Sequence, residues 1–180
     1  MNRIRRIALM AAALLGVIAL ALPARAADTT TTFTLAGGAL SVSAPASKDL
    51  GSGPTGGGTV SAQLGSVTVT DARGALAGSW TATVSSTDFT TGGATANETI
   101  AKASVTYWSG TATATSGTAV FAPGQALAAN AQALSASRTA FSASATVGNN
   151  SASWNPTVTV NVPAAAVAGN YSGTITHSVA

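Results

Sequence analysis

The chain has 180 residues, of which only 7% are charged, and it contains no cysteine. Its formal net charge is +3, but four of its eight basic residues lie within the first 25 positions, which leaves four basic and five acidic side chains over 27–180. Four scattered cations cannot neutralise a run of phosphates, so the composition excludes a nucleic-acid binder, and the lack of cysteine excludes a disulfide framework and a thiol nucleophile.

The first 26 residues have the three parts of a secretory signal peptide. Three arginines form a basic start, an apolar run covers 7–22, and Ala24-Arg25-Ala26 fits the small-x-small pattern of a cleavage site. A membrane anchor is the alternative, but it would need about 20 apolar residues and no cleavage site. We therefore expect export, cleavage after Ala26, a single extracellular domain over 27–180 and no contact with a membrane afterwards.

After the leader, residues 33–42 predict a first strand and the glycine-rich stretch 51–58 predicts a flexible loop. Residues 64–86 then carry the clearest strand pattern in the chain. Val67 and Val69 alternate with polar residues, and so do Trp80, Ala82 and Val84. Period-two alternation is typical of an antiparallel sheet with one buried face. We interpret these two runs as the paired arms of a hairpin, joined by a polar, glycine-bearing connection.

The middle of the chain gives a mixed signal. Residues 88–98 predict a loop, and in 101–108 Val105 and Tyr107 alternate with Lys102, Ser104, Thr106 and Trp108. Residues 117–122 predict a short strand. Residues 125–134 are equally compatible with a helix and with an irregular loop, because their apolar positions run together without a polar face.

The C-terminal part again alternates between apolar and polar residues. Phe141 to Val147 predicts a strand, Gly148-Asn149-Asn150 a turn, 154–162 a strand with Pro156 near its start, and 171–179 a last strand. The whole pattern predicts an all-β fold, an antiparallel Ig-like β-sandwich of roughly seven to nine strands. Its predicted core comprises Val67, Val69, Trp80, Val84, Val105, Val158, Val160 and Ile175.

A motif lies in the predicted hairpin. Residues 69–74 read Val-Thr-Asp-Ala-Arg-Gly, and Trp80-Thr81-Ala82 follows. Here the chain resembles the WxL-domain proteins, secreted surface proteins of Gram-positive bacteria, in which a similar segment leads to a Trp-x-Leu strand. Ala82 stands where that family has leucine.

The C-terminal end resembles the closing segment of the same family, in which a tyrosine precedes a second Trp-x-Leu. Tyr171 is the corresponding tyrosine, and His177 and Val179 stand where the family has tryptophan and leucine. The resemblance implies an Ig-like sandwich that associates non-covalently with the cell wall. Its family-motif residues in this chain are Asp71, Arg73, Gly74, Trp80 and Tyr171.

The residues capable of acid–base chemistry do not assemble into an enzyme site. His177 is the only histidine, and its alternation with Ile175 and Val179 favours a packed strand residue over a member of a catalytic triad. The five carboxylates offer no adjacent pair for glycoside hydrolysis and no calcium loop. Asp71 and Arg73 are two residues apart. The alternatives for them are an exposed structural pair and two separately solvated side chains. We expect no enzymatic activity, no cofactor and no metal.

Aromatic residues supply the tentative ligand contacts. Trp80 and Trp154 fall on apolar faces, which favours core packing. Trp108 follows Tyr107, so if Tyr107 is in the core, Trp108 points outward, either to stack on a sugar ring or to be covered by a loop. Trp108 and His177 are the tentative ligand-binding residues.

Two functions remain after these exclusions. The first is a non-enzymatic surface protein that binds the peptidoglycan of the cell wall, with cell-wall glycan or other surface proteins as partners. The alternative is a fimbrial or extracellular-matrix subunit that assembles by β-strand addition, with the strand signal over 33–42 as donor. The sequence leaves the ligand and the oligomeric state open.

Overall fold

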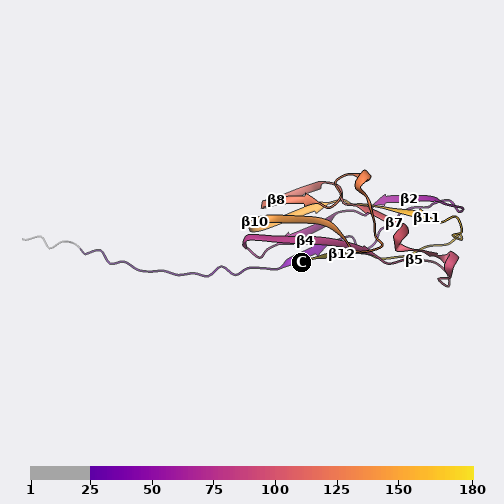
Figure 1. Cartoon of the computed structure of the whole chain (residues 1–180). Coiled ribbons are helices and arrows are strands. Elements are labelled where there is room, and N and C mark those ends of the chain that lie inside the picture. The colour runs from indigo at the N-terminus through magenta and orange to yellow at the C-terminus, as the bar shows by residue number, and fades with distance from the viewer. Residues whose placement is uncertain (1–24) are drawn as a thin grey trace, which may run out of the picture. The chain divides into compact units, whose positions relative to one another are not determined.

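The computed structural model describes residues 25–180 (Figure 1). Residues 1–24, which include most of the predicted signal peptide, lie outside the described part, so the leader stays a prediction. Residues 25–34 are exposed and form no helix or strand, whereas residues 35–180 form a compact unit of β-structure. No helix within 25–180 has both the length and the apolar character that a membrane crossing requires.

All strand pairs within the described residues are antiparallel, and they form two large sheets and one small one. In chain order the strands are β1 (Leu40–Ser43), β2 (Gly58–Gln63), β3 (Val67–Asp71), β4 (Leu76–Ser86), β5 (Phe89–Thr90), β6 (Thr99–Ile100), β7 (Val105–Trp108), β8 (Ala112–Pro123), β9 (Gln132–Ala133), β10 (Arg138–Trp154), β11 (Thr157–Val162) and β12 (Ile175–Val179). Three short 3₁₀ helices interrupt them: η1 (Ala96–Glu98), η2 (Lys102–Ser104) and η3 (Ala128–Asn130).

The larger sheet has the order β1-β3-β10-β4-β12, with β8 also paired to β10. The second sheet has the order β2-β11-β7-β9, and β5 pairs with β6 alone. The two large sheets enclose the core, because the apolar residues of their alternating strands face one another. The all-β antiparallel sandwich predicted from the sequence is therefore confirmed.

Aromatic side chains fill the centre of the core. Trp154 on β10 stacks on Phe141 with ring centroids 4.9 Å apart, and both are buried together with Trp80 and Tyr107. Seven of the eight predicted core residues are buried: Val67, Val69, Trp80, Val84, Val105, Val158 and Val160. The eighth, Ile175, is only half-buried because it begins the edge strand β12.

The predicted hairpin over 64–86 is wrong in its pairing. Both strands form, but β3 and β4 do not pair with each other, because each pairs with β10. Asp71 lies opposite Asn150 and Leu76 lies opposite Val147, so β3 and β4 follow one another along the same partner strand. The connection between them turns aside at this point, where the amide of Gly148 donates to the carbonyl of Ala75.

The turn predicted at Gly148-Asn149-Asn150 is also wrong. Strand β10 continues through these residues, with left-handed φ angles of +51° at Ala145 and +68° at Gly148 and shifts of register beside them. These irregularities bend the strand without ending it. The chain reverses instead at residues 155–156, so Trp154 closes β10 and does not begin the strand that contains Val158.

Other boundaries differ from the prediction because tertiary contacts decided them. The strand predicted over 33–42 is shorter and begins later. It covers 40–43 and pairs with β3. Residues 102–104 form η2, so Lys102 and Ser104 do not share a strand face with Trp108. The short strand expected at 117–122 is part of the longer β8, and 125–134 contains η3 and β9 without an α-helix. Tyr171 precedes β12, which begins at Ile175.

Candidate functional site

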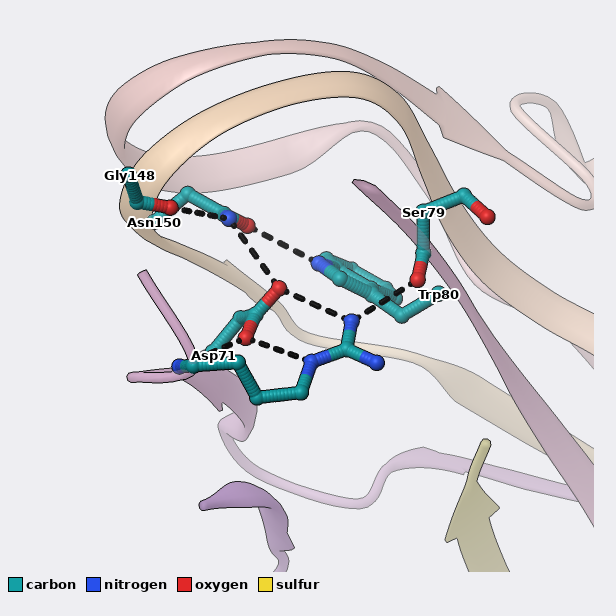
Figure 2. A network of polar contacts seen from close by, with 6 residues as sticks. Asp71, Ser79, Trp80, Gly148 and Asn150 are labelled. Atoms are coloured by element: carbon teal, nitrogen blue, oxygen red, sulfur yellow. Dashed lines mark hydrogen bonds and ion pairs between the residues drawn. The ribbon is translucent and has the colours of Figure 1, made fainter. Parts of the chain in front are cut away.

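Asp71 is the centre of a buried polar network at the junction of β3 and β4 (Figure 2). Its carboxylate is 1% exposed and accepts two hydrogen bonds from the guanidinium of Arg73, from Nε to Oδ1 at 2.8 Å and from Nη2 to Oδ2 at 3.0 Å. The backbone amide of Arg73 donates to Oδ1 as well, at 3.1 Å. The pair is therefore bidentate and half enclosed, not the exposed pair that the sequence suggested.

Asn150 joins this ion pair to the core. Its Nδ2 donates to Oδ2 of Asp71 at 3.3 Å, and its Oδ1 accepts the indole N–H of Trp80 at 2.9 Å (Figure 2). Arg73 also donates from Nη2 to the backbone carbonyl of Ser79 at 2.8 Å. The network thus connects β3, β4 and β10 at the place where β10 changes its partner.

The electrostatics of the network favour the charged carboxylate. Hydrogen bonds from Arg73 lower the pKa of Asp71 to about 2, against burial, which by itself would raise it, and Asn150 adds to the lowering. Asp71 is consequently ionised across the physiological range and cannot act as a proton donor there. The arrangement is that of a structural clamp.

The family-motif residues divide between two places. Asp71, Arg73 and Trp80 belong to the clamp, and Gly74 lies in its connection with a left-handed φ of +65°, a conformation that favours glycine. Tyr171 lies elsewhere: its hydroxyl proton is shared between the carbonyl of Val167 at 2.9 Å and that of Asn97 at 3.1 Å. These bonds hold the segment before β12 against the loop that contains η1.

A second polar chain crosses the core between the two sheets. Trp154 on β10 donates its indole N–H to the hydroxyl of Tyr107 on β7 at 3.0 Å, and that hydroxyl lies 3.2 Å from Nε2 of His177 on β12. Because the tyrosine oxygen accepts from Trp154, its own proton is free to be donated to His177.

Burial keeps both titratable groups of this chain neutral. It lowers the pKa of His177 to about 4 and raises the pKa of Tyr107 above its usual range. The ring of His177 packs against Tyr107 at 5.8 Å and Trp154 at 6.3 Å between ring centroids. His177 therefore occupies a packed strand position, which is the structural alternative that its alternation favoured.

The two tentative ligand residues are not brought together. His177 contacts Tyr107 on the core side of β7, whereas the next residue, Trp108, points to the opposite face, as neighbours in a strand do. Trp108 is half-buried and lies beside Gly110. Trp108 lines neither of the two hollows that border residues 46–50.

The structure contains a groove that the sequence analysis missed. It has a volume of about 800 Å³ and lies between the segments 46–55 and 166–173. Its floor consists of apolar side chains from four strands: Val60, Phe89, Ile100, Val160 and Val162. Its rim includes hydroxyl and amide groups, from Ser47, Ser52, Thr55, Asn170 and Ser172, together with small and apolar residues of the same two segments.

A smaller hollow of about 160 Å³ adjoins this groove and shares with it Ala46, Ser47, Lys48 and Leu50. His177 and Lys48 both line it. The only sequence signals for either hollow were the predicted loop at 51–58 and the gap between the predicted strands over 154–162 and 171–179. Those signals identify loops, but they do not reveal that the loops lie beside each other.

Comparison with known protein families identifies the family to which the chain belongs. Residues 26–180 match the family described as the WxL domain, surface cell wall-binding. No curated protein and no solved structure is significantly similar to the chain. The match covers nearly all of the described residues, including the Asp71 clamp, the His177 chain and the groove. The protein therefore belongs to the WxL family of cell-surface proteins, whose domain binds the cell wall.

Proposed function

We propose that residues 27–180 form a single non-enzymatic domain that binds peptidoglycan without a covalent link, and that the groove between 46–55 and 166–173 is where the glycan lies. The observation that carries this proposal is the composition of the groove. An apolar floor with hydroxyl and amide groups along its rim suits a sugar chain, which presents hydrophobic ring faces and a margin of hydroxyl groups.

The dimensions of the groove support a small segment of polymer as ligand. Its volume of about 800 Å³ lies within the range of roughly 300 to 1,000 Å³ found for ligand sites. Phe89 and Ile100 on its floor are 9% and 3% exposed, so the floor is held by the core and does not need to form on binding. Lys48 and Asp49 are the charged residues on the rim, and their opposite signs leave it neutral.

The chemistry of the titratable groups supports binding without catalysis. Asp71 is engaged by Arg73 and Asn150, and the neutral His177 is engaged by the hydroxyl of Tyr107. Both of these groups are thus occupied in holding strands together. A general base needs a substrate proton within hydrogen-bond distance, and these two groups are instead hydrogen-bonded to other side chains of the domain.

Sedimentation with isolated peptidoglycan tests the proposal. The wild-type protein is expected to pellet with the polymer at both low and physiological salt, because the rim is neutral. Asn170→Trp should fill the groove with a bulky ring and reduce pelleting, whereas Asn149→Trp, the same change at an exposed position on β10, should not.

Two outcomes separate the parts of the proposal. Wild-type protein that stays in the supernatant at both salt concentrations overturns peptidoglycan binding itself. Pelleting that is lost in Trp108→Ala but kept in Asn170→Trp moves the contact from the groove to the outward face of β7. Release of soluble fragments from the polymer would contradict a non-enzymatic role.

A further inference from the structure

Strand β8 offers a long free edge. It has 12 residues, and within the described part of the chain it pairs with β10 alone. Figure 1 shows it running alongside β10. Its other side therefore carries backbone N–H and C=O groups without a strand partner, the arrangement that accepts an added strand.

This edge lacks the usual protection. Natural edge strands are commonly kept apart by charged side chains, by proline or by a short length. No residue of β8 is charged, and its one proline, Pro123, is its last residue. Gly117, with a φ of +76°, interrupts the register with β10, and a second shift lies between Thr118 and Val120, so the part of the strand in regular register with β10 is 120–123.

An exposed apolar patch adjoins this part of the edge. The patch consists of Leu76, Val120 and Val147, which are 84%, 63% and 49% exposed. Val147 on β10 lies opposite both Leu76 on β4 and Thr118 on β8, and Val120 lies two residues beyond Thr118 on the same face. Three adjacent strands thus contribute to one apolar surface.

The chain itself contains a segment that matches this edge. Residues 29–36 read Thr-Thr-Thr-Thr-Phe-Thr-Leu-Ala, which combines β-branched residues with two alternating large apolar side chains. Phe33 and Leu35 are 87% and 86% exposed, and the segment belongs to no strand. It has no charge, so it meets no repulsion along β8, and its period of two places Phe33 and Leu35 on one face.

The sheet order directs this segment to another molecule. In the row Val42, Val69, Ala152 and Thr115, strands β3 and β10 separate β1 from β8. A strand added beyond β8 would lie four strand spacings from β1, or about 19 Å. The four steps from residue 36 to Leu40 span at most about 14 Å, so the segment falls short of the edge of its own sheet.

We propose that residues 29–36 of one copy add as a strand to the free edge of β8 in a second copy and place Phe33 and Leu35 on the apolar patch. Each molecule then has one donor segment and one acceptor edge. Such a head-to-tail contact repeats from copy to copy and builds a chain or a ring. This association is separate from the glycan groove and would connect neighbouring molecules on the same wall.

Cysteine cross-linking tests the contact directly, because the natural chain has no cysteine. Purified Phe33→Cys protein is mixed with Val120→Cys protein under mild oxidation and the disulfide-linked heterodimer is quantified. A several-fold higher yield is expected than with Thr59→Cys as partner, which places the thiol at an exposed position of β2, an edge of the other sheet. Equal yields with the two partners would overturn the proposal.

Light scattering across a range of concentrations supplies the second readout. Wild-type protein should form oligomers whose average mass rises with concentration, and Phe33→Asp with Leu35→Asp should remain monomeric. Both substitutions lie outside the folded strands, so they leave the fold intact. Wild-type protein that stays monomeric at high concentration, or a Phe33→Cys/Val120→Cys chain that closes its disulfide within a monomer, would exclude exchange between copies.

Discussion

The indole N–H of Trp154 on β10 donates to the hydroxyl of Tyr107 on β7 at 3.0 Å, and both side chains are completely buried. This bond joins the two large sheets at the centre of the core. It also places the hydroxyl of Tyr107 next to His177 on a third strand, β12. A single oxygen atom from one sheet therefore satisfies polar groups on two strands of the other sheet, and its removal would leave both groups without this partner.

Tyr107→Phe should lower the free energy of unfolding by about 1 to 3 kcal/mol, because a buried donor loses its acceptor. Chemical denaturation followed by tryptophan fluorescence measures this change. Tyr171→Phe is the matched control, and it should cost less, because the hydrogen bonds of Tyr171 lie at the surface, where water replaces them. Equal losses in the two variants would contradict a special role for the central hydroxyl.

Acidification should destabilise the protein through His177. Burial lowers the pKa of His177 from its ordinary value of 6.5 to about 4, so between these values the unfolded state binds the proton more tightly. Stability is full above pH 6.5, falls as the pH approaches 4 and levels off below it. We expect a loss of about 1 to 3 kcal/mol, allowing for the partial exposure of the ring.

Denaturation curves from pH 8 to pH 4 measure that loss. His177→Gln cannot titrate and should flatten the curve over this range. Tyr107 faces the histidine ring and Lys48 lines the adjoining hollow, and no carboxylate shares that lining. A wild-type curve that is already flat between pH 7 and pH 5 would show that His177 titrates normally in the folded state.

Arg73→Ala should be more harmful than the partial exposure of the arginine suggests. It leaves the carboxylate of Asp71, which is 1% exposed, with Asn150 as its remaining side-chain donor. Breaking a buried pair on one side is strongly destabilising, and the 36% exposure of Arg73 moderates the loss, which should still exceed that of an ordinary surface substitution. Denaturation at pH 7 gives the value.

The pKa of Asp71 provides an independent check on this pair. It should rise from about 2 in the wild type when the hydrogen bonds from Arg73 are removed, as measured by nuclear magnetic resonance titration of the carboxyl carbon. Asp71→Asn with Arg73 retained is the control, since it removes the charge and keeps the shape. If Arg73→Ala costs less than about 0.5 kcal/mol, as ordinary surface changes do, the pair is not structural.

Trp80→Ala should destabilise the protein by about 3 to 5 kcal/mol, as expected for a fully buried aromatic ring. Trp80 is 2% exposed and packs near Phe121 and Phe141, with ring centroids 6.4 and 6.5 Å away. Trp80→Phe keeps most of the packing but removes the hydrogen bond to Asn150, so about 1 to 2 kcal/mol is expected. A loss below about 1 kcal/mol for Trp80→Ala would place the ring at the surface.

A double-mutant cycle separates packing from hydrogen bonding at this position. Asn150→Ala combined with Trp80→Phe should cost less than the sum of the two single changes, because both remove the same bond. Strict additivity would mean that the bond between Trp80 and Asn150 contributes nothing to stability.

The sequence by itself determined the fold class and most of the core. Alternation at Val67 and Val69, and again at Trp80 and Val84, identifies the buried face of a strand, because successive side chains point to opposite sides. All four residues are buried. Side-chain direction is a local property of the backbone, so it can be deduced from neighbouring residues alone.

Only the tertiary structure decided which strands pair. Backbone hydrogen bonds join strands whatever their side chains, so the sequence of β3 and β4 does not reveal that β10, about seventy positions further on, pairs with both. Tertiary structure also decided the conformation of Gly148-Asn149-Asn150. These turn-forming residues continue β10 because the side-chain amide of Asn150 forms hydrogen bonds with Asp71 and Trp80. These long-range contacts outweigh the local preference for a turn.

The candidate sites depended on tertiary structure still more. Spacing suggested a pair between Asp71 and Arg73, but the burial of Asp71 follows from the approach of Asn150 on a distant strand. The groove exists because two loops, 46–55 and 166–173, meet over a shared apolar floor. A hollow between segments more than a hundred residues apart leaves no periodic signal in the chain. The order of the strands in the sheets brings these segments together, and neighbouring residues in the sequence do not reveal that order.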